Sequence, residues 1–116
     1  MVERAVTTVY NNYGPSNKIQ IFISCRNLKN MDVLSKSDPE CFVYIRDNKN
    51  KNYTLIGKTE TVNNNLNPDF TKHFTLDYFF EREQFLKFEV YDVDINGKDH
   101  IGNCEITIGK LMTSSK

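Results

Sequence analysis

The stretch that decides the fold is Leu86-Lys-Phe-Glu-Val-Tyr-Asp-Val-Asp-Ile-Asn-Gly-Lys-Asp-His-Ile-Gly102. Its first half alternates apolar and polar residues, with Leu86, Phe88 and Val90 at every second position, which predicts a half-buried strand. The second half is an acidic loop around Gly97, with the oxygen-bearing residues Asp92, Asp94, Asn96 and Asp99. Carboxylates this close repel one another unless a cation compensates, and hard oxygen ligands without a Cys–His set favour Ca²⁺ or Mg²⁺ over zinc. A solvated hairpin tip is the alternative, because Asp, Asn and Gly all favour turns.

Length and composition limit the possible functions. The chain has 116 residues, enough for one domain, and its 15 basic and 15 acidic residues balance. We therefore expect no general affinity for nucleic acid, and any electrostatic function must come from local clusters. Cys25, Cys41 and Cys104 are odd in number and far apart, which predicts reduced thiols and a cytoplasmic protein. No apolar run has transmembrane length, so membrane contact is expected to be peripheral.

Short strand patterns alternate with turn signals along the chain. The expected strands are Ile19–Arg26, Cys41–Arg46, Tyr53–Thr61, Phe70–Tyr78, the strand from Leu86, and Asn103–Ile108. This pattern predicts an all-β protein, an antiparallel Greek-key β-sandwich without internal domain boundaries. We expect residues 1–18 to be a polar, loosely ordered leader and residues 19–116 to form the domain.

A second acidic loop strengthens the interpretation of the first one as a cation site. Asp32 and Asp38 frame a connection that we expect at one end of the sandwich, and alternate connections of a Greek-key sandwich meet at the same end. Five carboxylates from two loops would suit two or three Ca²⁺ ions. Asp38 alone is equally well explained as a turn residue before Pro39. The spacing Asp92-x-Asp94-x-Asn96-Gly97 matches the start of an EF-hand loop, but the twelfth position is Asn103 and a strand precedes it, so we reject the EF-hand.

Other candidate sites are weaker. Lys49, Lys51 and Lys58 could form a basic patch for an anionic membrane, although such lysines more often solvate a sheet edge. His100 in the acidic loop is more simply a loop residue than a catalytic base. No trio of nucleophile, base and orienting residue can be named, so we expect no enzyme, and a metal-dependent hydrolase using Asp92 and Asp94 is disfavoured.

Several stretches follow one another in a characteristic order: Ser24–Leu28, Ser35–Pro39, Asn64–Pro68, Asp77–Glu81, Phe88–Asp94 and Ile101–Gly102. Because of these stretches, the chain from about Ile19 onward resembles a C2 domain, specifically the first C2 domain of the copines. The resemblance implies an eight-stranded antiparallel sandwich of type II topology that binds Ca²⁺ through loop aspartates and docks on acidic phospholipid. It also implies a longer protein, through whose other parts further protein partners are possible.

The resemblance assigns roles to individual residues. It implies that the calcium ligands are Asp32 and Asp38 in the first loop, with Asp92, Asp94 and Asp99 in the third. Residues expected to dip into the membrane interface are Met31, Val33, Leu34 and Ile95, with inward packing as the alternative for Leu34.

Two departures from the family are visible. Only Ile95 to Lys98 separate the paired aspartates from Asp99, which predicts a short third loop. The chain also stops near Lys116, where the family has one more strand, which would pair with the strand at Ile19; we therefore expect the domain to lack its final strand.

The function expected is calcium-dependent binding of an acidic phospholipid membrane, by a cytoplasmic protein recruited to the inner face of the plasma membrane when calcium rises. The alternative is a calcium-independent β-sandwich that binds other proteins.

Overall fold

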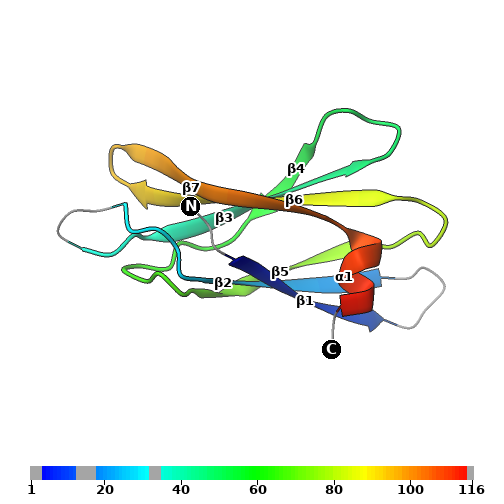
Figure 1. The fold of residues 1–116 in the computed structure, drawn as a ribbon, viewed down its shortest axis with the longest axis horizontal. Helices are drawn as coiled ribbons and strands as arrows, with labels where there is room; N and C mark the ends of the chain where they lie inside the picture. Colours follow the sequence, from blue (N-terminus) through cyan, green and yellow to red (C-terminus); the bar gives the residue numbers. More distant parts are fainter. Residues whose placement is uncertain (1–3, 13–17, 32–34, 115–116) are drawn as a thin grey trace.

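Two antiparallel sheets lie face to face in the structure, a computed structural model that describes residues 4–12, 18–31 and 35–114 (Figure 1). The elements are β1 (Arg4–Asn12), β2 (Lys18–Arg26), β3 (Pro39–Asp47), β4 (Thr54–Lys58), β5 (Asp69–Asp77), β6 (Gln84–Asp94), β7 (Gly97–Thr107) and α1 (Ile108–Ser114). One sheet has the order β1-β2-β5 and the other β4-β3-β6-β7. The prediction of an all-β antiparallel sandwich is confirmed.

The core lies between the sheets and follows the alternation in the sequence. In β2, Ile19, Ile21 and Ile23 are buried, and in β6 Phe88 and Val90 face them from the other sheet. Burying one such side chain stabilises the fold by about 1.5–3 kcal/mol. The helix α1 adds two more buried residues, Ile108 and Leu111, to this core. β6 lies between β3 and β7, and the alternating residues of the stretch that begins at Leu86 put one of its faces inside the sandwich.

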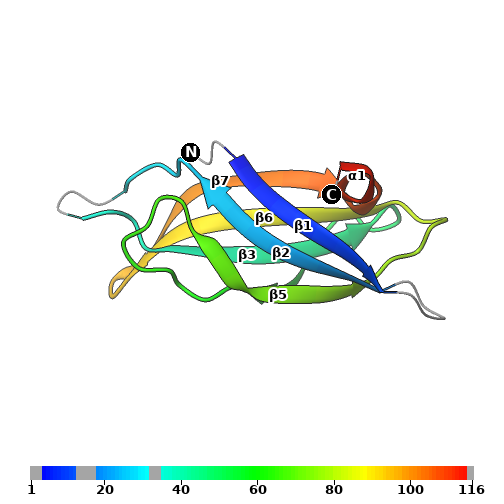
Figure 2. The ribbon, with the colours of Figure 1, turned by 90° about the horizontal axis from the view of Figure 1, so that it is seen from below.

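The N-terminal segment differs from our expectation of a loosely ordered leader. Residues Arg4–Asn12 form β1, which pairs with β2 along its whole length, from Arg4 opposite Arg26 to Asn12 opposite Lys18. The segment contains Val6, Thr7, Thr8 and Val9 in succession, and β-branched residues favour strands even when half of them are polar. The position beside β2, which we expected a final strand of a type II domain to fill, is thus filled by β1 (Figure 2).

A close approach between the sheets explains one glycine. A Cβ atom on Gly57 in β4 would lie 2.8 Å from Cε2 of Phe74, whose ring comes from β5 in the other sheet. No real Cβ contact is that short, so the ring of Phe74 occupies the space that a larger residue at position 57 would need.

Glu60 connects the two sheets from outside the core. Its Oε2 accepts a hydrogen bond from the Thr71 amide at 2.6 Å and its Oε1 one from the Lys72 amide at 3.1 Å. Partial burial of this carboxyl raises its pKa, but the backbone hydrogen bonds lower it by more, so the net pKa lies below the usual value.

The cysteines are free, as predicted: Cys25 and Cys41 are buried and Cys104 is half-buried. Burial raises the pKa of Cys25 to about 12 and moves that of Cys41 well above its usual value. Within the ranges that the structure describes, no helix has the length and apolarity to cross a membrane.

Candidate metal centre

Three connections meet at one end of the sandwich, the left end in Figures 1 and 2. We call them the first loop (residues 27–38), the Asn turn (residues 62–67) and the acidic hairpin (residues 92–99). Hydrogen bonds join all three: the Val93 amide donates to the Asp38 carbonyl at 3.0 Å, and the Asn64 amide donates to Oδ1 of Asp38 at 2.6 Å. The expectation that the two acidic loops share one end is therefore met.

The acidic hairpin is tighter than an open loop. We expected the strand to end before Asp92, but β6 continues to Asp94 and β7 begins at Gly97, leaving Ile95 and Asn96 as the turn. The Asn96 amide donates to Oδ1 of Asp94 at 2.7 Å, and Gly97 has a φ of 131°, which favours glycine. Neither of the turn residues Ile95 and Asn96 has a positive φ, so the positive φ falls on Gly97, the first residue of β7, and a glycine there lets both strands extend into the acidic stretch.

The pleat of this hairpin collects its aspartates on one face. Side chains two residues apart on a strand share a face, so Asp92 and Asp94 continue the inward series of Phe88 and Val90. Asp99 pairs directly with Asp92 across the two strands and lies on that same face. Like charges directly opposite each other destabilise a hairpin, so this face is arranged to favour a cation.

Asp92 is the innermost of these carboxylates, with 0% of its surface exposed. Its Oδ1 accepts a hydrogen bond from the Asp38 amide at 2.9 Å. Asp94 and Asp99 are exposed, which gives the face a graded series from a buried carboxylate to solvent-facing ones. Asp32 and the two apolar residues Val33 and Leu34 lie outside the described residues.

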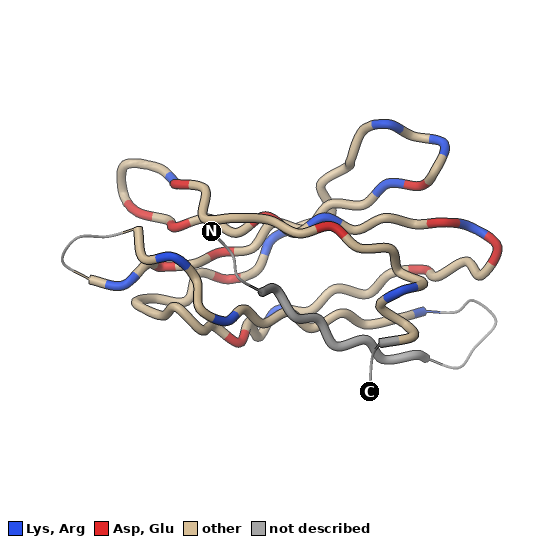
Figure 3. The backbone as a smooth tube through the Cα atoms, viewed as in Figure 1, with Lys and Arg blue, Asp and Glu red and all other residues tan. Residues whose placement is uncertain are grey.

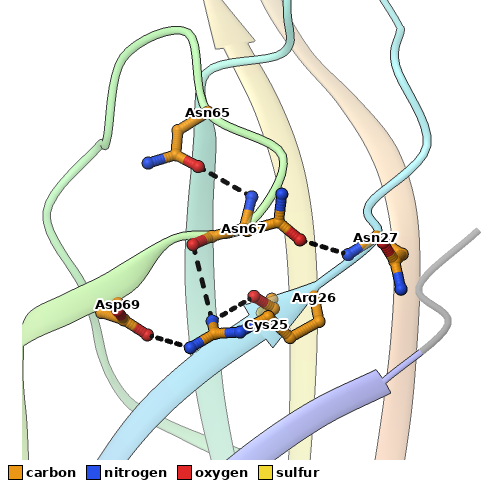
Figure 4. A network of polar contacts seen from close by, with 6 residues as sticks. All are labelled: Cys25, Arg26, Asn27, Asn65, Asn67 and Asp69. Carbon is orange, nitrogen blue, oxygen red and sulfur yellow. Dashed lines mark hydrogen bonds and ion pairs between the residues drawn. The ribbon is translucent and has the colours of Figure 1, made fainter.

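Two side chains, those of Ser37 and Asn67, hold the first loop in place through hydrogen bonds. Ser37 is fully buried, and its hydroxyl accepts a bond from the Met31 amide at 2.7 Å and donates one to the Lys29 carbonyl at 3.2 Å. Asn27, with a φ of 57°, donates its amide to Oδ1 of Asn67 at 2.9 Å. Figure 4 shows this contact beside the ion pair between Arg26 and Asp69, which are 2.8 Å apart. The Asn turn thus holds the beginning of the first loop as well as its end.

The donor atoms at this end are of the kind that Ca²⁺ prefers. Asp38, Asp92, Asp94 and Asp99 offer carboxylate oxygens, the ligands that hard cations prefer. His100 is not part of this face, because it pairs with Tyr91 on the outer side of the hairpin, where its Nε2 lies 3.2 Å from Oε1 of Glu89. Among the described residues alone, no group of three or more acidic, histidine or cysteine side chains is placed so that it could hold a metal ion.

The predicted membrane residues are placed differently from one another. Ile95 is 100% exposed at the tip of the acidic hairpin. Met31 is half-buried and packs against the core, so the structure does not present it as an exposed apolar tip.

The lysines predicted as a basic patch do not lie together. Lys49 and Lys51 are exposed in the β3–β4 connection, which extends to the upper right of Figure 3, away from the acidic hairpin at the left. Lys58, at the other end of β4, lies 3.3 Å from Oε2 of the buried Glu40. Sequence reasoning missed Lys98, whose ammonium lies over the rings of Phe42 and Tyr91, 4.0 and 4.6 Å from their centroids. It covers the outer side of the hairpin whose inner side carries the aspartates.

Comparison with known proteins agrees with the β-sandwich fold. Residues 19–116 match the sequence model of the C2 domain. The chain belongs to the C2 domain family. Among solved structures, this C2 domain is similar to BON1-C2B, with 27% identity, a TM-score of 0.68, and coverage of 86% of this chain and 70% of that one. It shares its fold with a C2 domain of RIM from Drosophila, with a TM-score of 0.69 at 16% identity, covering 100% of this chain and 94% of that one.

The resemblance to copines is also confirmed. The C2 domain is 48% identical over 108 residues to Copine-E of Dictyostelium discoideum, which covers 88% of this chain and 19% of that protein. The chain thus spans about a fifth of the length of the curated relatives it matches.

Proposed function

We propose that this C2 domain binds acidic phospholipid membranes in a calcium-dependent way. The observation that carries the proposal is the direct contact between Asp38 and Asp92, which joins the first loop to the acidic hairpin beneath an exposed Ile95. The proposed ligands are Asp32, Asp38, Asp92, Asp94 and Asp99, for two or three Ca²⁺ ions.

The chain's own residues supply three parts of this function. Asp38 and Asp92 hold the two loops together, so the carboxylates need little ordering before a cation is bound. The hairpin presents Asp94 and Asp99 toward solvent on one face. Bound calcium would reverse the sign of the local potential and offer open coordination positions to lipid phosphate or carboxylate oxygens. Ile95 then adds apolar contact with the interface.

In the cell, this activity would recruit a cytoplasmic protein to the inner face of the plasma membrane when calcium rises. Other parts of the longer protein would supply protein partners.

The proposal is tested by sedimentation of the 116-residue chain with phosphatidylserine vesicles, in excess Ca²⁺ and in excess chelator. We expect binding only with Ca²⁺, little binding to phosphatidylcholine vesicles, and weaker binding for Asp94→Asn. Equal sedimentation in both conditions would refute the calcium switch. Calorimetry that detects no Ca²⁺ binding would favour the alternative, a calcium-independent protein-interaction domain.

A further inference from the structure

The Asn turn contacts the candidate metal centre at Asp38. The Asn64 amide donates to Oδ1 of Asp38 at 2.6 Å, and Oδ1 of Asn64 accepts from the Lys36 amide at 2.7 Å. One residue therefore holds both the carboxylate of Asp38 and the backbone two positions before it. The neighbouring Asn65 amide adds a third bond, to the Ser37 carbonyl at 3.0 Å.

These bonds complete the fixation of Asp38. Its amide donates to Asp92 and its carbonyl accepts from Val93, so its main chain is fixed to β6 on both sides. With Oδ1 held by Asn64, the plane of the carboxylate is also set, and with it the direction of Oδ2. Without that bond, the side chain would turn about its own torsions while its main chain stayed in place.

The backbone of Asn64 is unusual in a way that fits this role. Its φ is 55°, in the left-handed region that most residues avoid and that asparagine tolerates. Asn27 is the other described non-glycine residue with a positive φ, and it bonds to Asn67 rather than to Asp38. Among the described residues, two asparagines with a left-handed φ thus lie at this end of the sandwich. Asn64 contacts the proposed ligand, and Figure 4 shows the other, Asn27.

We infer that Asn64 is a positioning residue of the calcium site, which sets the orientation of the Asp38 carboxylate without binding the ion. The inference rests on the proposed function and extends it to the Asn turn, which supplies none of the proposed ligands. Residues that orient a metal ligand typically change metal affinity by about 10–100-fold when they are removed.

The experiment compares three variants of the 116-residue chain by calorimetric Ca²⁺ titration and thermal unfolding without calcium. Asn64→Ala loses the side-chain bond and disfavours the left-handed backbone. Asn64→Gly keeps that backbone and loses only the bond to Lys36. Asn27→Ala is the matched control, because it places alanine at nearly the same φ in a residue that does not touch Asp38.

We expect Asn64→Ala to weaken Ca²⁺ binding about tenfold and Asn64→Gly by a smaller factor, because the amide of residue 64 still reaches Asp38. Asn27→Ala should also lower the melting temperature without calcium, because it places alanine at a left-handed φ, but leave the Ca²⁺ affinity nearly unchanged. Hydrogen exchange of the Lys36 amide without calcium should accelerate in both Asn64 variants and not in Asn27→Ala.

The results separate the inference from the proposed function. If the unmodified chain binds Ca²⁺ and Asn64→Ala binds it equally well, the inference fails and the function stands. If Asn27→Ala weakens binding as much as Asn64→Ala, the effect is general destabilisation and the inference fails too. If the unmodified chain binds no Ca²⁺, both fail together.

Discussion

The buried carboxylate of Asp92 provides the most direct test of the proposed site. Replacement by asparagine keeps an oxygen in place to accept the bond from the Asp38 amide and removes the charge that a cation would need. The variant therefore separates the structural role of this side chain from its role in binding an ion.

The expected magnitudes follow from the structure. Hydrogen bonds to charged groups contribute about 1.5–3 kcal/mol and neutral ones about 0.5–1.5 kcal/mol, so weakening this bond costs about 1 kcal/mol. Removing the like-charge pair with Asp99, directly opposite on β7, returns about 0.2–1 kcal/mol. Without calcium, the free energy of unfolding of Asp92→Asn should therefore stay within about 1 kcal/mol of the unmodified value.

Calcium should stabilise the unmodified chain more than it stabilises Asp92→Asn. At a free concentration about 100 times Kd, one bound ion stabilises the native state by about 2.7 kcal/mol. For a domain of this size, that corresponds to a rise in Tm of about 10 °C. We expect this rise in the unmodified chain and less than about 3 °C in Asp92→Asn at the same calcium concentration.

The assay is thermal unfolding followed by circular dichroism, with and without Ca²⁺. Asp77→Asn is the control, because Asp77 is an exposed aspartate at the end of β5 that pairs with Lys18 at 2.6 Å. It should keep the full calcium-dependent rise. An equal rise in Asp92→Asn would show that Asp92 is not a ligand, and a collapse of its stability without calcium would show that the charge is needed for folding.

Four further predictions concern other parts of the molecule. Ile95→Ser should weaken vesicle binding several-fold and leave the Ca²⁺ affinity unchanged, since this side chain is fully exposed; equal vesicle binding would remove Ile95 from the interface. Gly57→Ala should destabilise the fold by about 1–3 kcal/mol in urea unfolding, and much less in a Phe74→Leu background, where the ring that the new methyl would meet is gone. Because the pKa of Glu60 is lowered, its stabilising contribution is present above the unfolded-state value of 4.5 and is lost as pH falls through the folded-state pKa. Glu60→Gln should therefore lower the free energy of unfolding at about pH 7, and this difference from the unmodified chain should be smaller at about pH 3. Cys25 and Cys41 should resist iodoacetamide at about pH 8 until the protein unfolds, because burial raises both thiol pKa values; labelling of either in the native state, detected by mass spectrometry, would contradict this.

Periodicity alone identified the strands that form the core. Ile19, Ile21 and Ile23, and Leu86, Phe88 and Val90, alternate with more exposed residues and are buried as predicted. Residues 4–12 escaped the same reasoning because their β-branched residues include two threonines, so no apolar alternation marks them as a strand.

The candidate site was predicted in part. Two aspartates framing one loop and three in another indicated a shared end, and the bond between Asp38 and Asp92 joins them. The extension of β6 to Asp94 was missed, although Asp92 and Asp94 continue the inward period of Val90 and Asn96-Gly97 is a hairpin signal. The contact of Asn64 with Asp38 depends on a φ of 55°, and the sequence indicated only that an asparagine-rich turn tolerates such geometry.

The bonds between Glu60 and β5 have a consequence for the behaviour of the protein in concentrated solution. β5 lies at one edge of its sheet, and a free edge presents main-chain amides that can pair with a strand of another molecule. The Glu60 carboxylate already accepts from two consecutive amides of β5, Thr71 and Lys72, and it places a negative charge beside this part of the strand. Self-association of this domain through β5 would first have to displace an intramolecular acceptor, so this edge is protected against edge-to-edge aggregation by a residue that lies outside the strand.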